Sequence, residues 1–265
     1  MSGDKVLYDV DGTVAEITLN KPQEDNALSY EMYREILAGF ERARDDDVKC
    51  VVIQGAGDAF SIGYGVDTLE EEDVDHEMGA GDYIEKIQDT GHALIEEVIN
   101  FPLPTVAKID GPAFGDAACL AIGCDISLAS EDARVGFTHV RLGLSIDMAA
   151  TYLLPRLTGT KHAKELAYTG KIIGPERASE MGLINDVYPA DEFDSRCDQM
   201  ISTIAAGPPI ALRQINHLID QGIKTSLDHA LKSEATTQTM LVETDDFREA
   251  VTAFQEGRKP EYQGQ

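Results

Sequence analysis

The chain has 265 residues, 43% of them hydrophobic, and carries 48 acidic against 22 basic side chains for a formal net charge of −26. This length suits one substantial core, with or without a smaller helical appendage. No apolar run approaches the ~20 residues of a membrane span, and the N-terminus lacks a signal-peptide pattern, so we expect a cytoplasmic protein. No basic stripe is present to neutralise phosphates, which disfavours nucleic acid as a partner.

The acidic excess is spread along the chain rather than confined to a tail, which suggests adaptation to high salt. At ~1 M salt the Debye length is about 3 Å, so repulsion between like charges on the surface is largely screened. We therefore expect a halophilic protein whose activity needs salt.

The first third of the chain predicts a hairpin, a helix and a strand. Val6 to Leu19 alternates around Asp11-Gly12, which is a hairpin signal. Ser29 is placed to cap a helix that runs to about Arg44. Lys49 to Gln54 is a continuous apolar strand, and the acidic run from Glu70 to Glu77 predicts a mobile segment.

The middle of the chain alternates helix and strand. An amphipathic helix from Tyr83 to Asn100 precedes a β-branched strand from Thr105 to Ile109 and a turn at Asp110-Gly111-Pro112. A small-residue helix opens near Gly115, and Asp125 to Ala129 reads as the next strand. A strand, a turn and a helix N-terminus aim backbone N–H groups at one point, which suits an oxyanion that develops during a reaction.

The rest of the chain becomes helical. Helices are predicted from near Asp147, from Thr160 to Thr169 and from Pro175 to Met181, and helices dominate after Asp191. The pattern predicts an α/β core over residues 1–190 and a helical C-terminal module over 191–265.

Short motifs occur in order along almost the whole chain. They read Asn26-Ala27-Leu28, Ala59-Phe60-Ser61-Ile62-Gly63-Tyr64, Ile109-Asp110-Gly111-Pro112-Ala113-Phe114-Gly115-Asp116, Cys124-Asp125-Ile126, Gly143-Leu144 and Phe254-Gln255-Glu256-Gly257-Arg258-Lys259-Pro260. In this order they resemble the crotonase (enoyl-CoA hydratase/isomerase) superfamily. The resemblance implies a ββα spiral core, an acyl-CoA substrate, no further cofactor, and a homotrimer or dimer of trimers that assembles through the C-terminal module.

The resemblance also implies an oxyanion hole made of two backbone N–H groups, which fall on Tyr64 and Asp116. Backbone donors do not depend on the side chain, so the hole survives these residue types. The Asp116 carboxylate would oppose an oxyanion beside it. We interpret this side chain as a helix cap that points away, with a protonated or a participating carboxylate as the alternatives.

Binding of CoA is implied for two groups of residues. In the resembled family the early motifs and the turn line the pantetheine and adenine sites, and an aromatic and a basic residue near the C-terminus contact CoA, often from a neighbouring subunit. The candidates in this chain are Asn26, Ala27, Leu28, Ala59, Ser61, Ile62, Gly63, Tyr64, Phe114, Gly115, Asp116, Phe254 and Lys259.

The acid and base groups depart from the hydratase pattern. The two Glu residues that place water on an enoyl double bond are replaced by Cys119 and His139. Asp147 lies where several relatives place a working carboxylate, and the related C–C bond hydrolases pair such an Asp with a His at the position of His139. The resemblance thus implies Asp147, with His139, for proton transfer. The alternatives are that Asp147 is only a helix N-cap and that His139 only packs.

The remaining histidines and the cysteines are not expected to take part in catalysis or metal binding. His92 lies twelve residues before Pro104, the spacing of the dehalogenase base of the superfamily, but we favour a half-exposed helix histidine without a catalytic role. The four cysteines form no C-x-x-C pair and no zinc spacing, so buried thiols and no metal site are expected.

Three functions remain open. The expected one is an acyl-CoA enzyme that stabilises a thioester enolate, with isomerisation, unconventional hydration and hydrolysis all possible within it. The others are a CoA-independent β-diketone or C–C bond hydrolase, which a pair of His139 with Asp147 would support, and a catalytically silent CoA-binding protein.

Overall fold

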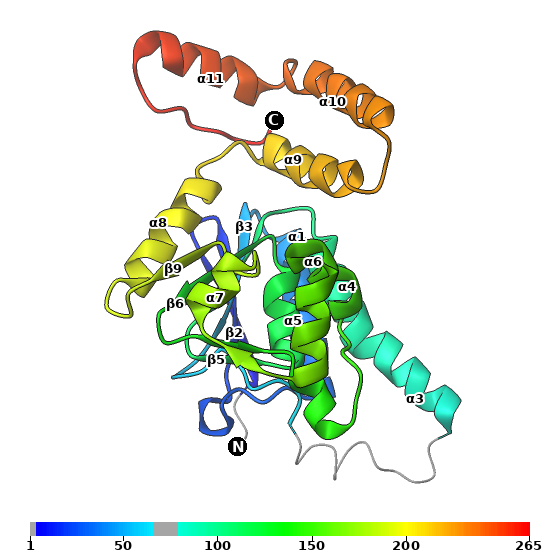
Figure 1. Cartoon of the computed structure of the whole chain (residues 1–265). Helices are drawn as coiled ribbons and strands as arrows, with labels where there is room; N and C mark the ends of the chain where they lie inside the picture. Colours follow the sequence, from blue (N-terminus) through cyan, green and yellow to red (C-terminus); the bar gives the residue numbers. More distant parts are fainter. Residues whose placement is uncertain (1–3, 66–78) are drawn as a thin grey trace.

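The computed structural model describes residues 4–65 and 79–265, so the acidic run from Glu70 to Glu77 lies outside the described residues. Within them the chain builds a layered α/β body, from which a helical C-terminal end extends (Figure 1). Strands and helices follow one another along the chain in the predicted order. No helix of the described residues is long and apolar enough to cross a membrane.

The strands form two sheets. The larger has the order β1-β2-β3-β4-β6-β9, with β1 and β2 antiparallel and the later pairs parallel, and the smaller has the order β5-β7-β8. The strands are β1 (Val6–Asp11), β2 (Val14–Leu19), β3 (Cys50–Gly55), β4 (Thr105–Ile109), β5 (Pro112–Phe114), β6 (Ile126–Ser130), β7 (Arg134–Gly136), β8 (Ile172–Ile173) and β9 (Asp186–Tyr188).

The helices follow the predicted segments closely. They are α1 (Tyr30–Asp45), α3 (Ala80–Ile87), α4 (Ala93–Ile99), α5 (Asp116–Gly123), α6 (Ala150–Thr169), α7 (Pro175–Glu180), α8 (Phe193–Ala205), α9 (Pro209–Gly222), α10 (Leu227–Leu241) and α11 (Asp245–Glu256). Shorter turns are the 3-10 helices η1 (Pro22–Glu24) and η4 (Thr138–Leu142) and the π-helical η3 (Gln88–His92).

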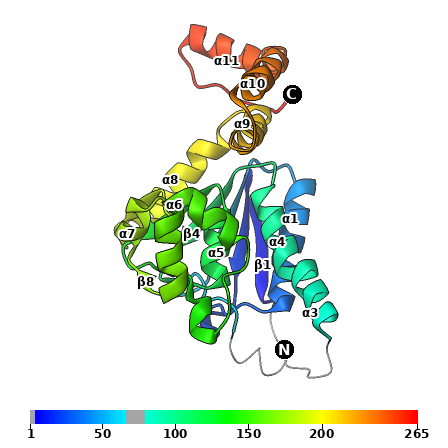
Figure 2. The same cartoon turned by 45° about the vertical axis from the view of Figure 1, so that its right-hand side comes forward.

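The central strands are buried on both faces because alternate side chains enter two clusters. Val51 and Ile53 of β3 pack into the cluster that α1, α4 and α5 complete, whereas Cys50 and Val52 pack with Phe193 of α8. Figure 2 shows α1 and α4 beside the sheet. A continuous apolar run such as β3 is what such a two-sided burial requires.

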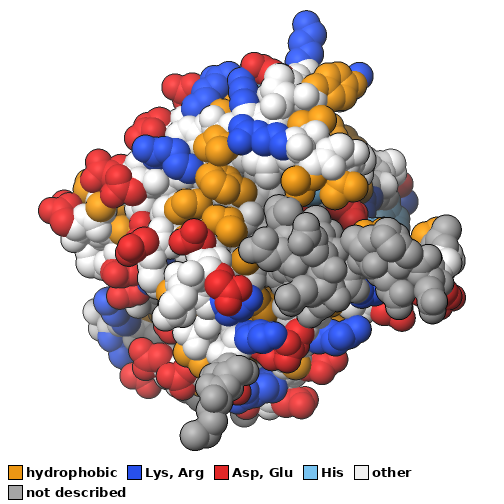
Figure 3. Space-filling view, turned by 90° about the horizontal axis from the view of Figure 1, so that it is seen from below, with side chains coloured by type: hydrophobic (Ala, Val, Ile, Leu, Met, Phe, Trp, Pro, Cys, Tyr) orange, Lys and Arg blue, Asp and Glu red, His pale blue; other side chains and the backbone are white. Residues whose placement is uncertain are grey.

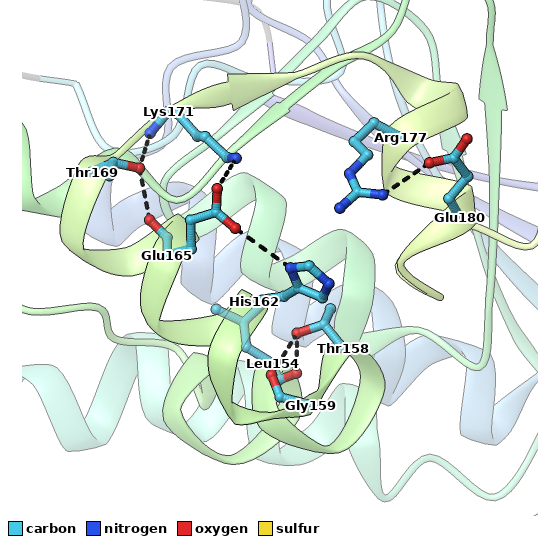
Figure 4. A network of polar contacts seen from close by, with 9 residues as sticks. All are labelled: Leu154, Thr158, Gly159, His162, Glu165, Thr169, Lys171, Arg177 and Glu180. Atoms are coloured by element: carbon cyan, nitrogen blue, oxygen red, sulfur yellow. Dashed lines mark hydrogen bonds and ion pairs between the residues drawn. The ribbon is translucent and has the colours of Figure 1, made fainter.

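Helix ends are set by local side chains. The N–H of Met32 donates to Ser29 Oγ over 3.3 Å, so Ser29 caps α1 as predicted. The helix expected near Asp147 begins at Ala150 and is interrupted at Gly159, whose φ of 75° is not helical. Beside this break the Thr158 hydroxyl donates to the Leu154 carbonyl over 2.9 Å (Figure 4).

The C-terminal helices differ in how much they bury. Phe193, Cys197 and Ile201 of α8 pack on the sheet. Helices α9 to α11 leave many large apolar side chains exposed; these are Ile215, Ile219, Ile223, Leu227, Leu231, Met240, Phe247, Val251 and Phe254. One link to the body is the Asn216 amide, which donates to the Phe101 carbonyl over 3.0 Å.

Charged side chains of both signs cover much of one face of the molecule. Figure 3 shows acidic side chains over the face seen from below, with Lys and Arg side chains between them and apolar side chains in a stripe. With 48 acidic residues against 22 basic ones, many acidic groups have no basic neighbour available.

Candidate active site

A cavity of about 380 Å³ lies where the N-terminus of α5 meets α1, α3, η3 and the segment after η4. Its wall is mostly apolar and aromatic, with a few polar groups, as is typical of small-molecule sites. It is lined by Tyr30, Tyr33, Ile62, Tyr64, Tyr83, Ile87, Gly91, Gly115, Asp116, Thr138, His139, Leu142, Leu144, Ser145, Ile146, Asp147 and Met148.

One wall of the cavity is a close contact between two backbone segments. Gly63 has φ of 82°, and a Cβ added there would lie 2.3 Å from the Phe114 carbonyl oxygen and 3.3 Å from the Asp116 nitrogen. The N–H of Leu28 donates to the Gly63 carbonyl over 2.8 Å and fixes the first segment. Tyr64 follows Gly63 directly, so its backbone and that of Asp116 meet at the cavity.

Asp116 opens α5, and the first residues of a helix have no acceptor for their N–H groups in a preceding turn. The predicted capping role of its side chain is wrong. Its Oδ1 lies 2.7 Å from His139 Nε2, and its Oδ2 accepts the Tyr33 hydroxyl over 2.6 Å. Burial, with the nearby Asp116 charge, raises the pKa of Tyr33 well above its ordinary value, so Tyr33 is a constant donor.

His139 pairs with Asp116, so the predicted pair of His139 with Asp147 is wrong. The residue is 8% exposed, and its Nδ1 is buried without a hydrogen-bond partner in the described part of the chain. With a proton on Nε2, the ring donates to the Asp116 carboxylate.

Asp147 pairs instead with His92, whose Nε2 lies 2.7 Å from Asp147 Oδ1. These side chains are 44% and 45% exposed, so His92 is half-exposed as expected but not without a partner. Asp147 is not an N-cap either, because Ala149 occupies that position of α6. The Asp147 side chain borders both the main cavity and a neighbouring one of about 500 Å³ that His92 lines.

The backbone around this pair is unusual on both sides. His92 ends the π-helical turn η3, a geometry that occurs frequently at functional sites. Met148 and Ala149 follow Asp147 with φ of 49° and 57°, which non-glycine residues rarely adopt. Gly91 leaves room for Met148, since a Cβ there would lie 2.9 Å from the Met148 sulfur. Strain of this kind persists where the surrounding structure imposes it.

The predicted CoA-binding residues divide into two sets. Ile62, Tyr64, Gly115 and Asp116 line the cavity. The other residues lie behind the cavity wall. The Asn26 amide donates to the carbonyls of Ala56 and Ala59. The remaining members are buried or half-buried, and they are Ala27, Leu28, Ala59, Ser61, Gly63 and Phe114.

The two C-terminal candidates lie far from the cavity in a single chain. Phe254 of α11 is 88% exposed and Lys259 follows it, while the cavity-lining α3 is at the other end of the molecule (Figure 1).

Several cavity residues escaped the sequence analysis. Tyr30 and Tyr33 are three apart in α1, and Gly91 carries no chemistry of its own. The i, i+3 spacing of two tyrosines was the available signal. Other histidines lie elsewhere: His162, for example, contacts Glu165 over 3.4 Å on the surface of α6 (Figure 4).

The chain is similar to known proteins over nearly its whole length. A family model described as enoyl-CoA hydratase/isomerase matches residues 9–265. The enoyl-CoA isomerase/hydratase fer4 of Mycosarcoma maydis is 32% identical, covering 95% of this chain and 93% of its own. The 1,2-epoxyphenylacetyl-CoA isomerase of Escherichia coli is 30% identical over 98% of both.

A solved structure described as a putative enoyl-CoA hydratase from Streptomyces coelicolor superposes with a TM-score of 0.91 at 30% identity. The match covers 99% of this chain and 95% of that chain.

Proposed function

Since this chain belongs to the enoyl-CoA hydratase/isomerase family and has its crotonase-like α/β fold, we propose that it shifts the double bond of an acyl-CoA thioester by proton transfer. An enzyme of the hydratase/isomerase kind can use one cavity for either reaction. The observation that carries isomerisation is the Asp147 carboxylate on the cavity wall, bonded to His92 over 2.7 Å.

The thioester oxygen is bound, in this proposal, by the backbone N–H groups of Tyr64 and Asp116. The contact of Gly63 with the 114–116 segment supports it, because it brings the two backbones together at the cavity. The helix N-terminus at Asp116 favours a developing negative charge. The Asp116 carboxylate is hydrogen-bonded to Tyr33 and His139, and these bonds hold its negative charge away from the thioester oxygen.

Asp147 is the base. It removes a proton from the carbon α to the thioester of a 3-enoyl substrate, and the electron pair delocalises onto the thioester oxygen. The same carboxyl group then returns the proton to the γ carbon, which leaves the conjugated 2-enoyl product. No atom is gained or lost, and no cofactor beyond the CoA of the substrate takes part. His92 positions the carboxylate between the two steps.

Hydration is the second candidate. Asp116 and His139 form another carboxylate–imidazole pair that lines the same cavity as Asp147, which favours binding of a water molecule there. The C–C bond hydrolase alternative relied on a pair of His139 with Asp147, and these residues have other partners.

Assembly completes the site in this proposal. The exposed apolar side chains of α9 to α11, in the module over 191–265, support a homotrimer or dimer of trimers, in a cytoplasm of high salt. Phe254 and Lys259 of one subunit then reach the CoA bound to the next, together with residues around Ile62. Burial in such an interface would explain why the apolar side chain of Phe254 is 88% exposed in a single chain.

The test is incubation of 3-enoyl-CoA and crotonyl-CoA with the enzyme in molar KCl. Isomerisation gives a product of unchanged mass that absorbs as a conjugated enoyl thioester, whereas hydration of crotonyl-CoA adds one water. Asp147→Asn is expected to abolish either turnover. If neither substrate changes, or if Asp147→Asn retains wild-type turnover, the proposal fails.

A further inference from the structure

We propose that Asp116, Cys119 and His139 form a binding site for one thiophilic divalent cation of the zinc class in the cavity wall. Each residue offers one ligand atom, and the three atoms lie within 4.8 Å of one another. A carboxylate oxygen, a thiolate sulfur and an imidazole nitrogen are the three ligand types that zinc takes in proteins.

The fold brings these ligands together from two elements. Asp116 and Cys119 are three apart in α5 and therefore share one face of the helix. His139 lies in η4, which follows the strand β7 that pairs with β5 just before α5. The sequence predicted no metal site because its four cysteines form no C-x-x-C pair and no zinc spacing.

The site is held in place before any ion binds. Cys119 is fully buried and His139 is 8% exposed, so neither ligand has much freedom to move. The Tyr33 hydroxyl holds Asp116 Oδ2 and leaves Oδ1 directed at His139, in the manner of the outer partners that orient metal ligands. A bound ion takes the place of the hydrogen bond between Asp116 and His139, and the imidazole then binds the ion through Nε2 and carries its proton on Nδ1.

Charge also favours a cation here. Burial, with the Asp116 and Asp147 carboxylates, raises the pKa of the Cys119 thiol well above its ordinary value, so the empty site holds a neutral thiol. A divalent ion takes Cys119 as the thiolate, so its binding releases the thiol proton. Asp116 and His139 line the cavity, so the fourth tetrahedral position is open to water or a substrate oxygen.

The experiment is a titration of EDTA-treated protein with Co²⁺, whose thiolate complexes absorb in the near ultraviolet, followed by displacement with Zn²⁺. We expect one Co²⁺ per chain with a thiolate-to-cobalt band in the wild type. Cys119→Ala should remove the band. Cys124→Ala is the matched control, because Cys124 is a buried thiol at the other end of α5 and donates to the Leu120 carbonyl instead.

Asp116→Asn is a second variant and should weaken Co²⁺ binding at least tenfold, so the test stands even if Cys119→Ala does not fold by circular dichroism. Absence of a saturable band in the wild type, or a band that both variants retain, overturns the proposal. Turnover of the EDTA-treated enzyme is measured separately. It tests the proposed isomerisation, which uses no metal.

Discussion

Two carboxylate–imidazole pairs contribute to the cavity and differ in how far water reaches them. The side chains of Asp116 and His139 are 16% and 9% exposed, whereas those of Asp147 and His92 are 44% and 45% exposed. Water screens the second pair, which can exchange protons with a substrate and with solvent. The first pair is better suited to holding fixed geometry.

His92 is expected to position Asp147, so His92→Ala should lower kcat by about tenfold to a hundredfold, within the range of general-base effects. His92→Gln should recover part of this loss, because its amide N–H can still donate to the carboxylate. Steady-state kinetics of the two variants check this. His162→Ala is the control, since His162 is also 44% exposed and contacts an acidic residue, Glu165, outside the cavity. Equal losses in all three variants contradict the assignment.

Asp125 gives a pH-dependent prediction. Burial raises its pKa to about 6, although the Thr105 N–H and hydroxyl donate to it. The folded state therefore holds this proton more tightly than the unfolded chain, and the stability it contributes is lost as pH rises from about 4 through 6. Asn does not ionise in this pH range. As pH rises across the window, the free energy of unfolding of Asp125→Asn should therefore increase by roughly 3 kcal/mol relative to that of the wild type.

Urea unfolding of both proteins at several pH values in constant salt measures this difference. The comparison cancels the titration of the other acidic groups, which the two proteins share. A difference that is flat with pH would falsify the assignment of the proton to Asp125.

The sequence predicted only some of the contacts between residues of the site. Asp147 and Asp116 were found because each stands at a recognisable place in a motif. The predicted partner of Asp147 was His139 instead of His92, and Asp116 was predicted to be a helix cap, because the true partners depend on how η3 and η4 approach the cavity. Tyr33 was missed for the same reason: periodicity places it in the core but not beside Asp116.

At the level of elements, the cavity depends on how closely the Gly63 turn approaches α5. Gly63→Ala should lower kcat at least a hundredfold and destabilise the fold by a few kcal/mol, because the new Cβ meets the Phe114 carbonyl at 2.3 Å.

Gly12→Ala is the matched control, with φ of 60° and no atom within 4 Å of its added Cβ. It should cost about 1 kcal/mol from backbone strain alone and leave kcat unchanged. Thermal unfolding and kinetics distinguish the two variants. Equal effects would mean that the contact with α5 does not matter.

Most elements were predictable, since alternation and 3.6-residue periods are local properties. The hairpin, the capped helix α1 and the strands β3, β4 and β6 lie within a few residues of their predicted bounds. The π-helical turn inside the predicted helix from Tyr83 to Asn100 was not predictable. The apolar residues Ile84, Ile87, Leu94, Ile95 and Val98 recur at spacings that a continuous α-helix also gives, so the pattern does not mark the turn.

For the whole molecule, the net charge of −26 determines how strongly the protein repels a polyanionic substrate. Repulsion between them is long-ranged in dilute buffer and acts over only about 3 Å at ~1 M salt. The order of the motifs along the chain made the global fold predictable. The exposure of the large apolar side chains of α9 to α11 was not, because a helical period does not show which apolar faces the rest of the chain leaves uncovered.

The KM for an acyl-CoA is accordingly expected to fall several-fold between 0.1 and ~2 M KCl, as screening removes the repulsion. The KM for the matching acyl-pantetheine, which lacks the nucleotide phosphates, should change little. Measuring both across a KCl series separates electrostatic repulsion from a general effect of salt on the fold. Parallel changes in the two KM values contradict the electrostatic explanation.

The π-helical turn that ends at His92 also affects how such a site can evolve. An α-helix advances 100° per residue, so deleting one residue between Gln88 and Gly91 would restore α-helical geometry and rotate one flank against the other by about that angle. A single-codon deletion would then separate an imidazole from Asp147 without altering any catalytic residue. Insertions and deletions in this turn, besides substitutions of His92, are therefore a route by which related chains can gain or lose the pair.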